Sequence, residues 1–589
     1  ATVSGVSDKV GGLVGYNSAN SNITACYSTG AVTGTVDGAK VGGLVGSNDG
    51  ATITSSYSTG NVSGYYAGGL AGRDRNGTIT NSYHTTGTVS SSKYAGGLVG
   101  YADYTMVSNS YNSGGVSVGG SYDGYAGGLV GYSVNTTGLG VKIEQSYNSG
   151  SVSVTNNGNS SRVAGGLIGG SDTSYIKDSY NTGSVTMTGA PSGSGGGLVG
   201  FNLGGGQINY SYNTGAVSGF TNAGGLAGGT TNMGGYYSYW DKETSGQTTT
   251  RGEGTGLTTA QMKQQSSFLG FDFATKWRMY EGQSNPLIKA LLTPLTVTAN
   301  NDSKTYDKTA YSGSAGVTYS TGAAPSGVFG SLTYGGSAQG ATNAGTYNIT
   351  ASGLYSTSQQ GYDITYTSGT LTINKAALTV TATANTKTYD GTTTAAATPA
   401  ITAGSLKGTD TAVLTAVYDN KNAGSGKTLT PTATINDGNG GNNYDVTYVT
   451  NTGVITKKDI TVNAVAATKT YDGTTTSTAA PTASGLVGGD TISGTQVYND
   501  KNAGSGKTLT VTGYTISDGN SGNNYNVTAV NTNTSGVITK KDVTVNAVAA
   551  TKTYDGDNTS TAAPTASGLV SGDTISGTQV YNDKNAGSG

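Results

Sequence analysis

The chain has very little of what metal sites, disulfides and charged interfaces are made of. Its 589 residues include one cysteine and one histidine, so an intramolecular disulfide and a pair of histidine zinc ligands are both impossible. Charged residues make up 11% of the chain and the net charge is -2, whereas about 25% of an average globular protein is charged. No basic cluster interleaves with aromatic residues, which argues against nucleic acid as a partner.

Long apolar runs and catalytic motifs are missing as well. No stretch of about eighteen apolar residues occurs, so the sequence predicts no membrane-spanning helix. Neither a His-Glu-x-x-His zinc motif nor a phosphate-binding Gly-x-x-x-x-Gly-Lys motif is found. Glycoside hydrolysis needs two carboxylates at a set separation, and the acidic residues of the first 235 positions are scattered singly. We therefore expect no enzymatic activity.

Glycine and tyrosine are abundant instead. The chain has 99 glycines, 40 tyrosines and only 8 prolines, together with much threonine and valine. Tyr, Thr and Val favour β-strands, and glycine favours the tight turns between them. The composition therefore predicts an all-β protein.

A short repeat organises the first 235 residues. Gly-Gly-Leu returns at intervals of about thirty residues, a period typical of solenoids; its leucines are Leu13, Leu44, Leu70, Leu98, Leu129, Leu167, Leu198 and Leu226. Each unit continues as Ile-x-x-Ser-Tyr-x-x-Gly and then x-Val-Ser. Each unit has three short apolar segments, around its Leu, Ile and Val positions. They predict three strands per coil and a β-helix with one coil per repeat.

Stacked coils would place equivalent residues in columns. We expect Leu, Ile and Val inside, a stacked tyrosine column whose direction stays open, and a serine ladder in which each hydroxyl donates to the next. The glycine after each tyrosine, such as Gly60, is expected to form a corner with positive φ. Cys26 takes the serine place in its unit, and His84 is expected to be an exposed residue without a function.

The irregular parts of the repeat are the predicted contact sites. The longest unit, between Leu129 and Leu167, carries insertions at 133–140 and 155–162, and loops of unequal length on a rigid scaffold often bind ligands. The candidate binding residues in this unit are Tyr132, Asn135, Asn156, Asn157 and Arg162.

Residues 236–293 break the pattern and are rich in aromatic residues. We expect a cap that covers the last coil, with a capping box at Thr258 and Gln261 and a short helix over 260–265. An aromatic platform for sugar is the alternative, and its candidate residues are Tyr237, Trp240 and Trp277.

A longer period begins after the cap. Thr-Tyr-Asp recurs about every 82 residues, which predicts modules at 294–376, 377–458 and 459–541 and a truncated one at 542–589. Their alternating apolar and polar stretches predict small antiparallel β domains, either sandwiches or β-grasp-like folds. The whole chain is thus expected to be an N-terminal β-helix (β-solenoid) with an aromatic-rich C-terminal cap, followed by tandem small β domains joined without flexible linkers.

Two loops of these modules have side chains of the kind that bind calcium. Oxygen-rich loops carry Asp437 and Asn439 in one module and Asp518 and Asn520 in the next. A single carboxylate per loop also fits an ordinary turn, which is the favoured interpretation. We predict no other cofactor.

The repeats resemble known families. Gly-Gly-Leu-Val-Gly followed by Ile-x-x-Ser-Tyr-x-x-Gly resembles the GLUG motif, Tyr-Asp-Gly-Thr with Asn-Ala-Gly-Ser-Gly-Lys resembles the YDG repeat, and residues 294–375 are similar to the MBG repeat. Their combination is typical of large adhesins of the biofilm matrix exported by two-partner secretion. This resemblance implies a secreted or surface-attached Gram-negative protein, an outer-membrane transporter for its export and anchoring, and a fragment of a longer chain.

The leading hypothesis is therefore a secreted, rod-like, non-enzymatic adhesin in cell-cell or cell-matrix adhesion and biofilm formation. Low charge with many Tyr, Thr and Asn suits extracellular polysaccharide, and a cell-surface receptor is a further possible partner. The alternatives are a passive stalk whose binding tip lies elsewhere and a self-associating, protein-binding rod.

Overall fold

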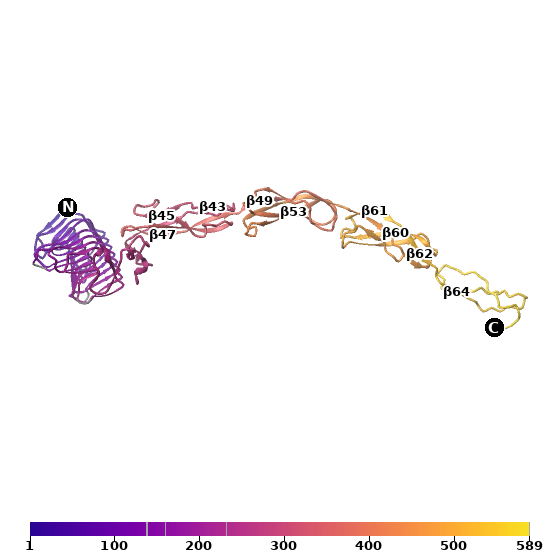
Figure 1. Cartoon of the computed structure of the whole chain (residues 1–589), viewed down its shortest axis with the longest axis horizontal. Helices are drawn as coiled ribbons and strands as arrows, with labels where there is room; N and C mark the ends of the chain where they lie inside the picture. Colours follow the sequence, from indigo (N-terminus) through magenta and orange to yellow (C-terminus); the bar gives the residue numbers. More distant parts are fainter. Residues whose placement is uncertain (137–139, 159–160, 231–232, 588–589) are drawn as a thin grey trace. The chain divides into compact units, whose positions relative to one another are not determined.

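The computed structural model describes residues 1–136, 140–158, 161–230 and 233–587, which form two compact units. Unit 1 contains Ala1–Asn301, Gly313–Gly336 and Asn348–Gly369, and unit 2 contains Asp302–Ser312, Ser337–Tyr347 and Thr370–Gly589. Almost all regular structure is β, which confirms the predicted fold class (Figure 1). No helix among these residues is long and apolar enough to cross a membrane.

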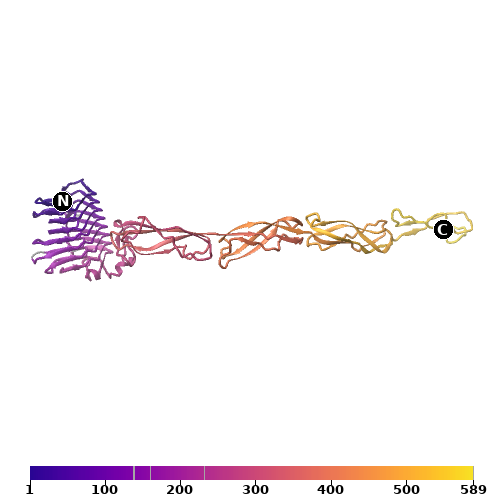
Figure 2. The same ribbon diagram turned by 90° about the horizontal axis from the view of Figure 1, so that it is seen from above.

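The first part of unit 1 is a solenoid of parallel strands, as predicted (Figure 2). Each repeat contributes to four sheets, here named A to D, rather than forming three strands. The extra strand is the Tyr-x pair, which is only two residues long in most coils and therefore has no alternating pattern to reveal it.

The strands of the four sheets stack in register, coil upon coil. Sheet A comprises β1 (Val3–Gly5), β2 (Lys9–Gly11), β6 (Val32–Gly34), β7 (Lys40–Gly42), β11 (Val62–Gly68), β15 (Val89–Gly96), β19 (Val116–Val118), β20 (Gly124–Gly127), β24 (Val152–Asn156), β25 (Arg162–Gly165), β29 (Val185–Gly189), β30 (Ser194–Gly196), β34 (Val217–Ser218) and β35 (Asn222–Gly224). Sheet B comprises β3 (Val14–Asn17), β8 (Val45–Asp49), β12 (Ala71–Arg75), β16 (Val99–Asp103), β21 (Val130–Val134), β26 (Ile168–Ser171), β31 (Val199–Asn202) and β36 (Ala227–Thr230).

Sheets C and D form the other two faces. Sheet C comprises β4 (Asn22–Thr24), β9 (Thr52–Thr54), β13 (Thr78–Thr80), β17 (Met106–Ser108), β22 (Val141–Glu144), β27 (Ser174–Lys177), β32 (Gly206–Asn209) and β37 (Met233–Tyr236). Sheet D comprises β5 (Tyr27–Ser28), β10 (Tyr57–Ser58), β14 (Tyr83–His84), β18 (Tyr111–Asn112), β23 (Tyr147–Asn148), β28 (Tyr180–Asn181), β33 (Tyr212–Asn213), β38 (Tyr239–Asp241) and β39 (Thr255–Leu257).

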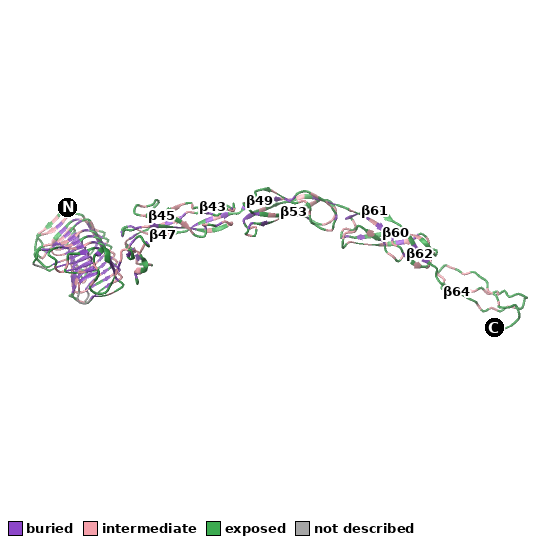
Figure 3. Ribbon diagram, viewed as in Figure 1, coloured by how far each residue is buried: buried purple, intermediate pink, exposed green. Residues whose placement is uncertain are grey.

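The repeat leucines from Leu44 onward line the interior together with the repeat isoleucines and valines (Figure 3), whereas Leu13 in the first coil is exposed. Leu44, Leu70 and Leu98 are fully buried in one column, and Ile53 and Ile79 in another. These columns confirm the predicted ladders of Leu and of Ile or Val. Burial of apolar area at about 25 cal/mol per Å² makes this core the main source of solenoid stability.

Glycine is required at these repeat positions because a side chain would clash with the neighbouring coil, and not because the backbone has positive φ. A Cβ on Gly97 would lie 2.1 Å from the carbonyl oxygen of Gly128, and one on Gly60 would lie 2.0 Å from that of Gly30. Gly60 does not have positive φ, so the predicted glycine corner is wrong. The left-handed corner lies before the serine instead, and its residues are Ala25, Ser55, Asn81, Asn109, Gln145, Asp178, Tyr210 and Tyr237, with φ of 44 to 53°.

The serine column is built differently from the prediction. The backbone N–H of Ser56 donates to Oγ of Ser82 at 3.1 Å, and the hydroxyl of Ser56 donates to the carbonyl of Thr54 at 2.8 Å. The same two bonds recur along the column. Each serine thus satisfies a backbone donor of the coil before it, because the left-handed corner has taken that N–H out of the strand ladder.

His84 is fully buried, contrary to the prediction of an exposed residue. It occupies an inward column whose other members include Asn112, Asn148, Asn181 and Asn213, and these amides are linked coil to coil by hydrogen bonds of 2.8 to 2.9 Å. Nε2 of His84 lies 3.1 Å from the carbonyl oxygen of Gly87 and Nδ1 lies 2.8 Å from Oγ of Ser58. The histidine is therefore one member of a buried column of hydrogen-bonded polar side chains, which we call the polar ladder.

The cap follows the last coil and covers its end. It contains α1 (Lys242–Ser245), the 3₁₀ turns η1 (Gln261–Lys263), η2 (Gln265–Ser267) and η3 (Lys289–Leu291), and the hairpin of β40 (Trp277–Arg278) and β41 (Leu287–Ile288). The capping box is present, because Gln261 N–H donates to Oγ1 of Thr258 and Thr258 N–H donates to Oε1 of Gln261. The predicted helix over 260–265 is instead two 3₁₀ turns, since Gln264 has extended φ and ψ of -114° and 119°.

Unit 1 also includes strands that follow the cap. These are β42 (Thr293–Ala299), β44 (Val317–Tyr319), β45 (Phe329–Gly335), β47 (Tyr362–Thr367) and, from Asn348 on, β46 (Gly345–Tyr355). Strand β42 pairs with β44 antiparallel and with β47 parallel. The loop 356–361, between β46 and β47, lies against the solenoid through the hydrogen bond from Tyr180 to Gln359.

Unit 2 contains tandem modules. Its strands are β43 (Asp302–Thr305), β48 (Gly369–Asn374), β49 (Ala376–Thr381), β50 (Asn385–Thr388), β51 (Ala400–Ala403), β52 (Thr411–Tyr418), β53 (Gly424–Asn436), β54 (Tyr444–Val449), β55 (Asn451–Thr456), β56 (Lys458–Asn463), β57 (Thr468–Thr470), β58 (Thr482–Ser484), β59 (Thr491–Tyr498), β60 (Gly504–Ser517), β61 (Tyr525–Asn531), β62 (Asn533–Thr539), β63 (Thr544–Asn546) and β64 (Thr565–Ser567).

Each complete module of unit 2 has two small sheets. In one module the sheets have the strand orders β51-β49-β54 and β50-β55-β53-β52, and the next module repeats this arrangement. Pairs such as β52 with β53 are antiparallel, but β49 with β54 and β50 with β55 are parallel. The sheets are therefore mixed rather than purely antiparallel as predicted.

Candidate functional site

A column of stacked tyrosine rings runs along the outside of sheet D. We call it the tyrosine ladder; its members are Tyr27, Tyr57, Tyr83, Tyr111, Tyr147, Tyr180 and Tyr212. Neighbouring ring centroids lie 4.8 to 5.1 Å apart and the planes differ by only 4 to 9°. The spacing equals that of β-strands, so the ladder follows directly from coil stacking in register.

Alternation along each coil decides which side chains face outward. In β10, Tyr57 points out while Ser58 is buried, and Thr59 after them is again partly exposed. A row of hydroxyl residues therefore accompanies the tyrosine ladder; its members are Thr29, Thr59, Thr85, Ser113, Ser149, Thr182 and Thr214. The structure thus answers the question that the sequence left open, since the tyrosine column faces outward.

One half of the ladder is covered by other parts of unit 1. Tyr147, Tyr180 and Tyr212 are buried among cap residues, and Trp277 lies 6.0 Å from the ring of Tyr212. The hydroxyl of Tyr180 donates to Oε1 of Gln359 at 3.0 Å, and that of Tyr212 donates to the carbonyl of Pro286 at 2.6 Å. The exposed fraction falls from 61% at Tyr27 to 1% at Tyr212.

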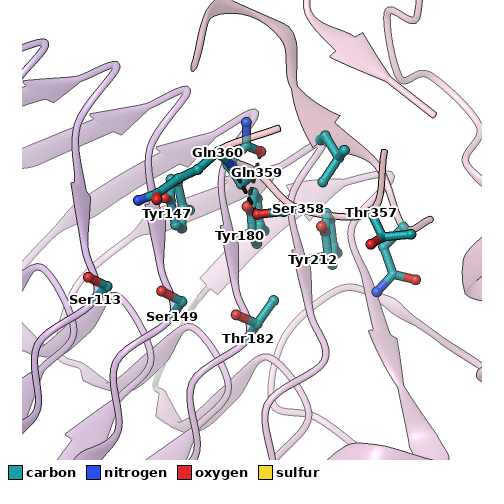
Figure 4. Close-up of a pocket in the computed structure, with 12 residues that line it drawn as sticks. Ser113, Tyr147, Ser149, Tyr180, Thr182, Tyr212, Thr357, Ser358, Gln359 and Gln360 are labelled. Carbon is teal, nitrogen blue, oxygen red and sulfur yellow. Dashed lines mark hydrogen bonds between the residues drawn. The ribbon is translucent and has the colours of Figure 1, made fainter. Parts of the chain in front are cut away.

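A pocket of about 440 Å³ opens where the cover meets the ladder (Figure 4). Tyr147, Tyr180 and Tyr212 form one wall, and Ser113, Ser149 and Thr182 follow one another beside them. The loop residues Thr357, Ser358, Gln359 and Gln360 lie across from this row (Figure 4). Asn285 and Leu287 also line the pocket. None of these lining residues carries a charge, so the pocket offers hydroxyl and amide groups together with tyrosine rings.

The other half of the ladder is open. We call it the open ladder and define it as Tyr27, Tyr57, Tyr83 and Tyr111, all exposed or half-buried. Its neighbours on sheet C are uncharged as well; they are Asn22, Thr24, Thr52, Thr54, Thr78, Thr80, Met106 and Ser108. The open ladder and the pocket therefore form one uncharged stripe along sheet D.

The phenol groups of Tyr83, Tyr111, Tyr147, Tyr180 and Tyr212 keep their protons at neutral pH. Burial raises the pKa of Tyr111 to about 12 and raises the pKa of Tyr83, with a smaller contribution from the neighbouring ring in each case. Burial raises the pKa values of Tyr147, Tyr180 and Tyr212 further. The ladder is thus a row of hydroxyl donors.

The predicted contact residues of the longest unit lie away from this stripe. Tyr132 is half-buried in sheet B and donates to Asp172 at 3.1 Å, and Asn135 donates to the same carboxylate and to Thr173. Both side chains link one coil to the next. Parts of the two insertions, residues 137–139 and 159–160, lie outside the described residues.

Asn156, Asn157 and Arg162 are not brought together as one site. Asn156 is buried and donates to the carbonyl of Ala190 at 2.7 Å, while Asn157 is exposed. Arg162 has no exposed surface, and its guanidinium donates to the carbonyls of Tyr122 and Gly120. Arg162 as a ligand contact is therefore corrected: it holds the loop of the preceding coil.

The aromatic candidates of the cap are mostly core residues. Trp277 is fully buried among cap aromatics, and Trp240 is 5% exposed with its Nε1 donating to the carbonyl of Gln247 at 2.8 Å. Neither indole face can stack on a sugar, so the alternative of an aromatic platform is corrected for these two. Tyr237 is half exposed and stacks on Tyr210 at 6.0 Å.

The calcium candidates form turns. In one loop, the Asp437 carboxylate accepts hydrogen bonds from the backbone N–H groups of Asn439, Gly441 and Asn443. Asp518 repeats this arrangement with Asn520 in the next module. These bonds occupy the carboxylate oxygens, and the described residues contain no cluster of three or more His, Cys, Asp or Glu side chains that could hold a metal.

Family models match three parts of the chain. The GLUG motif matches residues 9–33, 37–63 and 91–118, the MBG domain of YGX type matches 295–372, and the YDG domain matches 373–452 and 456–534. The chain therefore contains GLUG motifs, an MBG domain and YDG domains. This combination fits an adhesin-like extracellular repeat protein.

No curated protein matches the chain. Among solved structures, a putative immunoglobulin A1 protease from Bacteroides ovatus is similar at 18% identity, with a TM-score of 0.30; the match covers 47% of this chain and 87% of that one.

Sequence reasoning identified the tyrosine column but not the open ladder as a surface. The signal was present in Thr29, Thr59, Thr85 and Ser113, two residues after each tyrosine, because a period of two puts both on one face. The covering loop, with Gln359 and Gln360, lies far away in the sequence and carries no local signal.

Proposed function

We propose that this GLUG, MBG and YDG repeat protein is a non-enzymatic bacterial adhesin that binds neutral extracellular polysaccharide along the open ladder. The observation that supports the proposal is the uncharged stripe of hydroxyl groups beside stacked tyrosines, which ends in an uncharged pocket. Neutral polysaccharides present hydroxyl groups and apolar ring edges, and such a surface complements both without desolvating a charge.

The wider setting belongs to the same proposal. We place the protein outside a Gram-negative cell, secreted through an outer-membrane transporter, where it acts in adhesion between cells or to the biofilm matrix. The low net charge and the few charged residues near the stripe also support a partner other than nucleic acid.

A passive stalk is the second candidate, and one observation favours it. In unit 2, hydrogen bonds between equivalent positions link each module to the next. For example, Tyr389 donates to Asp490, and the backbone N–H of Ala423 donates to Asn524. Such repeated joints are what a protein needs to hold a partner in place, whether or not it binds sugar itself.

Binding by the whole chain separates the two candidates. Surface plasmon resonance on immobilised neutral polysaccharides should show saturable binding that survives at high salt, because no ion pair is involved. A double variant with Thr59→Asp and Thr85→Asp places two charges on the stripe and should abolish binding. Thr186→Asp on sheet A is the matched control and should bind like the wild type.

The stalk is favoured if no polysaccharide binds at millimolar sugar. Self-association of the rods is favoured if ultracentrifugation shows concentration-dependent complexes while sugar binding is absent. Equal binding by the wild type and the double variant would show that the polysaccharide binds elsewhere than on the open ladder.

A further inference from the structure

The covered half of the ladder shows which chemical group its hydroxyls bind. Tyr180 donates to the side-chain amide of Gln359 at 3.0 Å and Tyr212 to the peptide carbonyl of Pro286 at 2.6 Å. Tyr239, which follows Tyr212 in sheet D beyond the end of the ladder, donates to the carbonyl of Leu269 at 3.3 Å. Tyr111, at the edge of the cover, accepts a hydrogen bond from the amide of Gln360 at 3.4 Å. All four partners are amide groups.

Gln359 is the clearest example. Its Oε1 also accepts from the backbone N–H of Ile288 at 2.6 Å, and its Nε2 donates to the carbonyl of Ile288 at 2.8 Å. The carboxamide is thus fixed at one orientation, with its oxygen toward the hydroxyl of Tyr180 (Figure 4). A buried phenol that donates to an oriented carbonyl is a fully satisfied contact, which explains why this loop can cover the ladder.

The open ladder continues this surface without its cover. Within the described residues, the hydroxyls of Tyr27, Tyr57 and Tyr83 have no hydrogen-bond partner, although their rings keep the spacing of the covered half. The same row of donors therefore extends outward from the pocket at the same intervals, beside the hydroxyl groups of Thr29, Thr59 and Thr85.

We infer that the open ladder binds a polysaccharide of N-acetylated amino sugars. Each acetamido carbonyl accepts a hydrogen bond from a ladder hydroxyl, as Gln359 does, and its N–H reaches a neighbouring hydroxyl, as Gln360 does. The acetyl methyl group packs against the ring edges, and the sugar hydroxyls meet the Thr row. This inference rests on the proposed polysaccharide binding and names the sugar class.

Two features favour an acetylated sugar over other bearers of amides. A peptide that adds to a sheet needs a free strand edge, but β10, β14 and β18 each pair with a strand on both sides. A de-N-acetylated sugar carries an ammonium group, and no acidic side chain flanks the ladder at Tyr57 or Tyr83. The stripe therefore complements the neutral, acetylated form.

Calorimetric titration of the whole chain tests the inference with three short oligosaccharides of equal length. They are β-1,4-linked N-acetylglucosamine, the same oligomer after complete de-N-acetylation, and the corresponding β-1,4-glucan. We expect the acetylated oligomer to bind at least tenfold more tightly than either of the others, because only it carries the acetamido carbonyl.

Variants place the binding on the ladder. Tyr57→Phe with Tyr83→Phe keeps the stacked rings and removes two hydroxyls, so the acetylated oligomer should bind about tenfold more weakly. Tyr66→Phe with Tyr94→Phe removes two hydroxyls from a stacked pair on sheet A and should leave binding unchanged. Equal loss in both double variants would overturn the ladder as the site.

The outcomes keep the two proposals apart. Equal affinity for the acetylated oligomer and the glucan would overturn the inference and leave neutral polysaccharide binding intact. Binding of a glutamine-rich peptide without binding of the acetylated oligomer would replace the sugar by a protein partner. Absence of binding to every sugar would overturn both proposals together.

Discussion

The hydroxyl of Tyr306 donates a 2.8 Å hydrogen bond to the carboxylate of Asp410, a residue 104 positions further along the chain. Tyr444 donates to the same carboxylate at 2.8 Å, and Nζ of Lys308 lies 2.6 Å from its other oxygen. The tyrosine belongs to the recurring Thr-Tyr-Asp sequence, and the bond recurs as Tyr389 with Asp490 and Tyr471 with Asp573. One buried carboxylate thus joins two modules of unit 2.

Removal of this carboxylate should loosen the joint. Asp410→Ala leaves two buried tyrosine hydroxyls without their acceptor and removes the ion pair with Lys308, which then bonds only the carbonyl of Asp437. We expect a loss of about 2 to 3 kcal/mol in the unfolding free energy of this module. Hydrogen exchange of β43 and β50 under increasing denaturant measures it. The exposed Asp445→Ala is the control, and equal protection in both variants would contradict the role of the joint.

The contacts of Asp410 between the two modules should also become less stabilising in acid. Burial opposes ionisation of Asp410, but hydrogen bonds from Lys308, Tyr306 and Tyr444 together hold its pKa below the usual value. A carboxyl with a lowered pKa stabilises the fold above its unfolded pKa, and that stability is lost as the pH falls through the folded value. The difference in stability between wild type and Asp410→Ala should therefore shrink in acid.

The repeat glycines should be intolerant of even one methyl group. In Gly97→Ala the new Cβ would meet the carbonyl oxygen of Gly128 at 2.1 Å and the side chain of Asn112 at 2.4 Å. We expect a loss of about 3 kcal/mol or failure to fold, because the coils would have to separate. Gly119→Ala has no atom within 4 Å of its Cβ and should melt within a degree or two of the wild type. A stable Gly97→Ala variant would refute the close-approach explanation.

The sequence revealed the solenoid because its period and its columns of Leu, Ile and Tyr are direct consequences of coil stacking. It did not reveal the left-handed corners, since Ala25, Ser55, Asn81 and Gln145 share a backbone conformation and no side-chain type. Nor did it show that Trp277 is buried, because an aromatic ring suits a core and a binding platform equally. The cover over the tyrosine ladder depends on Gln359, whose partner Tyr180 is 179 residues away.

Asp74 should make the solenoid less stable as the pH rises. Its carboxyl is fully buried, and burial raises its pKa from 3.8 to about 6, although hydrogen bonds from Thr105 and Asn48 oppose this. The folded state then binds the proton more tightly than the unfolded state, so the stability contributed by Asp74 falls between about pH 4 and pH 6 and is level above that range. The pKa shift corresponds to about 3 kcal/mol.

A comparison with Asp74→Asn isolates this effect. The unfolding free energy of the wild type minus that of the variant should fall by this amount from pH 4 to pH 6, as measured by denaturant titration. Asp49→Asn should give a change of the opposite sign, and at lower pH, because the hydrogen bond from Arg75 lowers the pKa of Asp49 below 3.8 and its stabilisation is lost as the pH falls through that lowered value. A difference for Asp74 that does not change with pH would mean that its carboxyl titrates normally.

His84 should have the opposite pH dependence to Asp74. Burial lowers its pKa from 6.5 to about 4, against the hydrogen bonds with Gly87 and Ser58, so the folded state holds a neutral ring. Nε2 of the neutral ring donates to the carbonyl of Gly87, and the lost hydration of a buried charged ring opposes protonation of Nδ1. Stability is therefore lost as the pH falls from about 6.5 to about 4, by about 3 kcal/mol in all.

The variant His84→Asn supplies the reference, since asparagine fills the same column at Asn112 and in the three coils after it. Its unfolding free energy should lack this acid-dependent loss, so that the wild type becomes the less stable of the two as the pH falls toward 4. Thermal melts at closely spaced pH values, with the proton resonances of the single histidine followed in parallel, measure both quantities. A ring that titrates near 6.5 in the folded protein would show that the polar ladder is open to water at this rung.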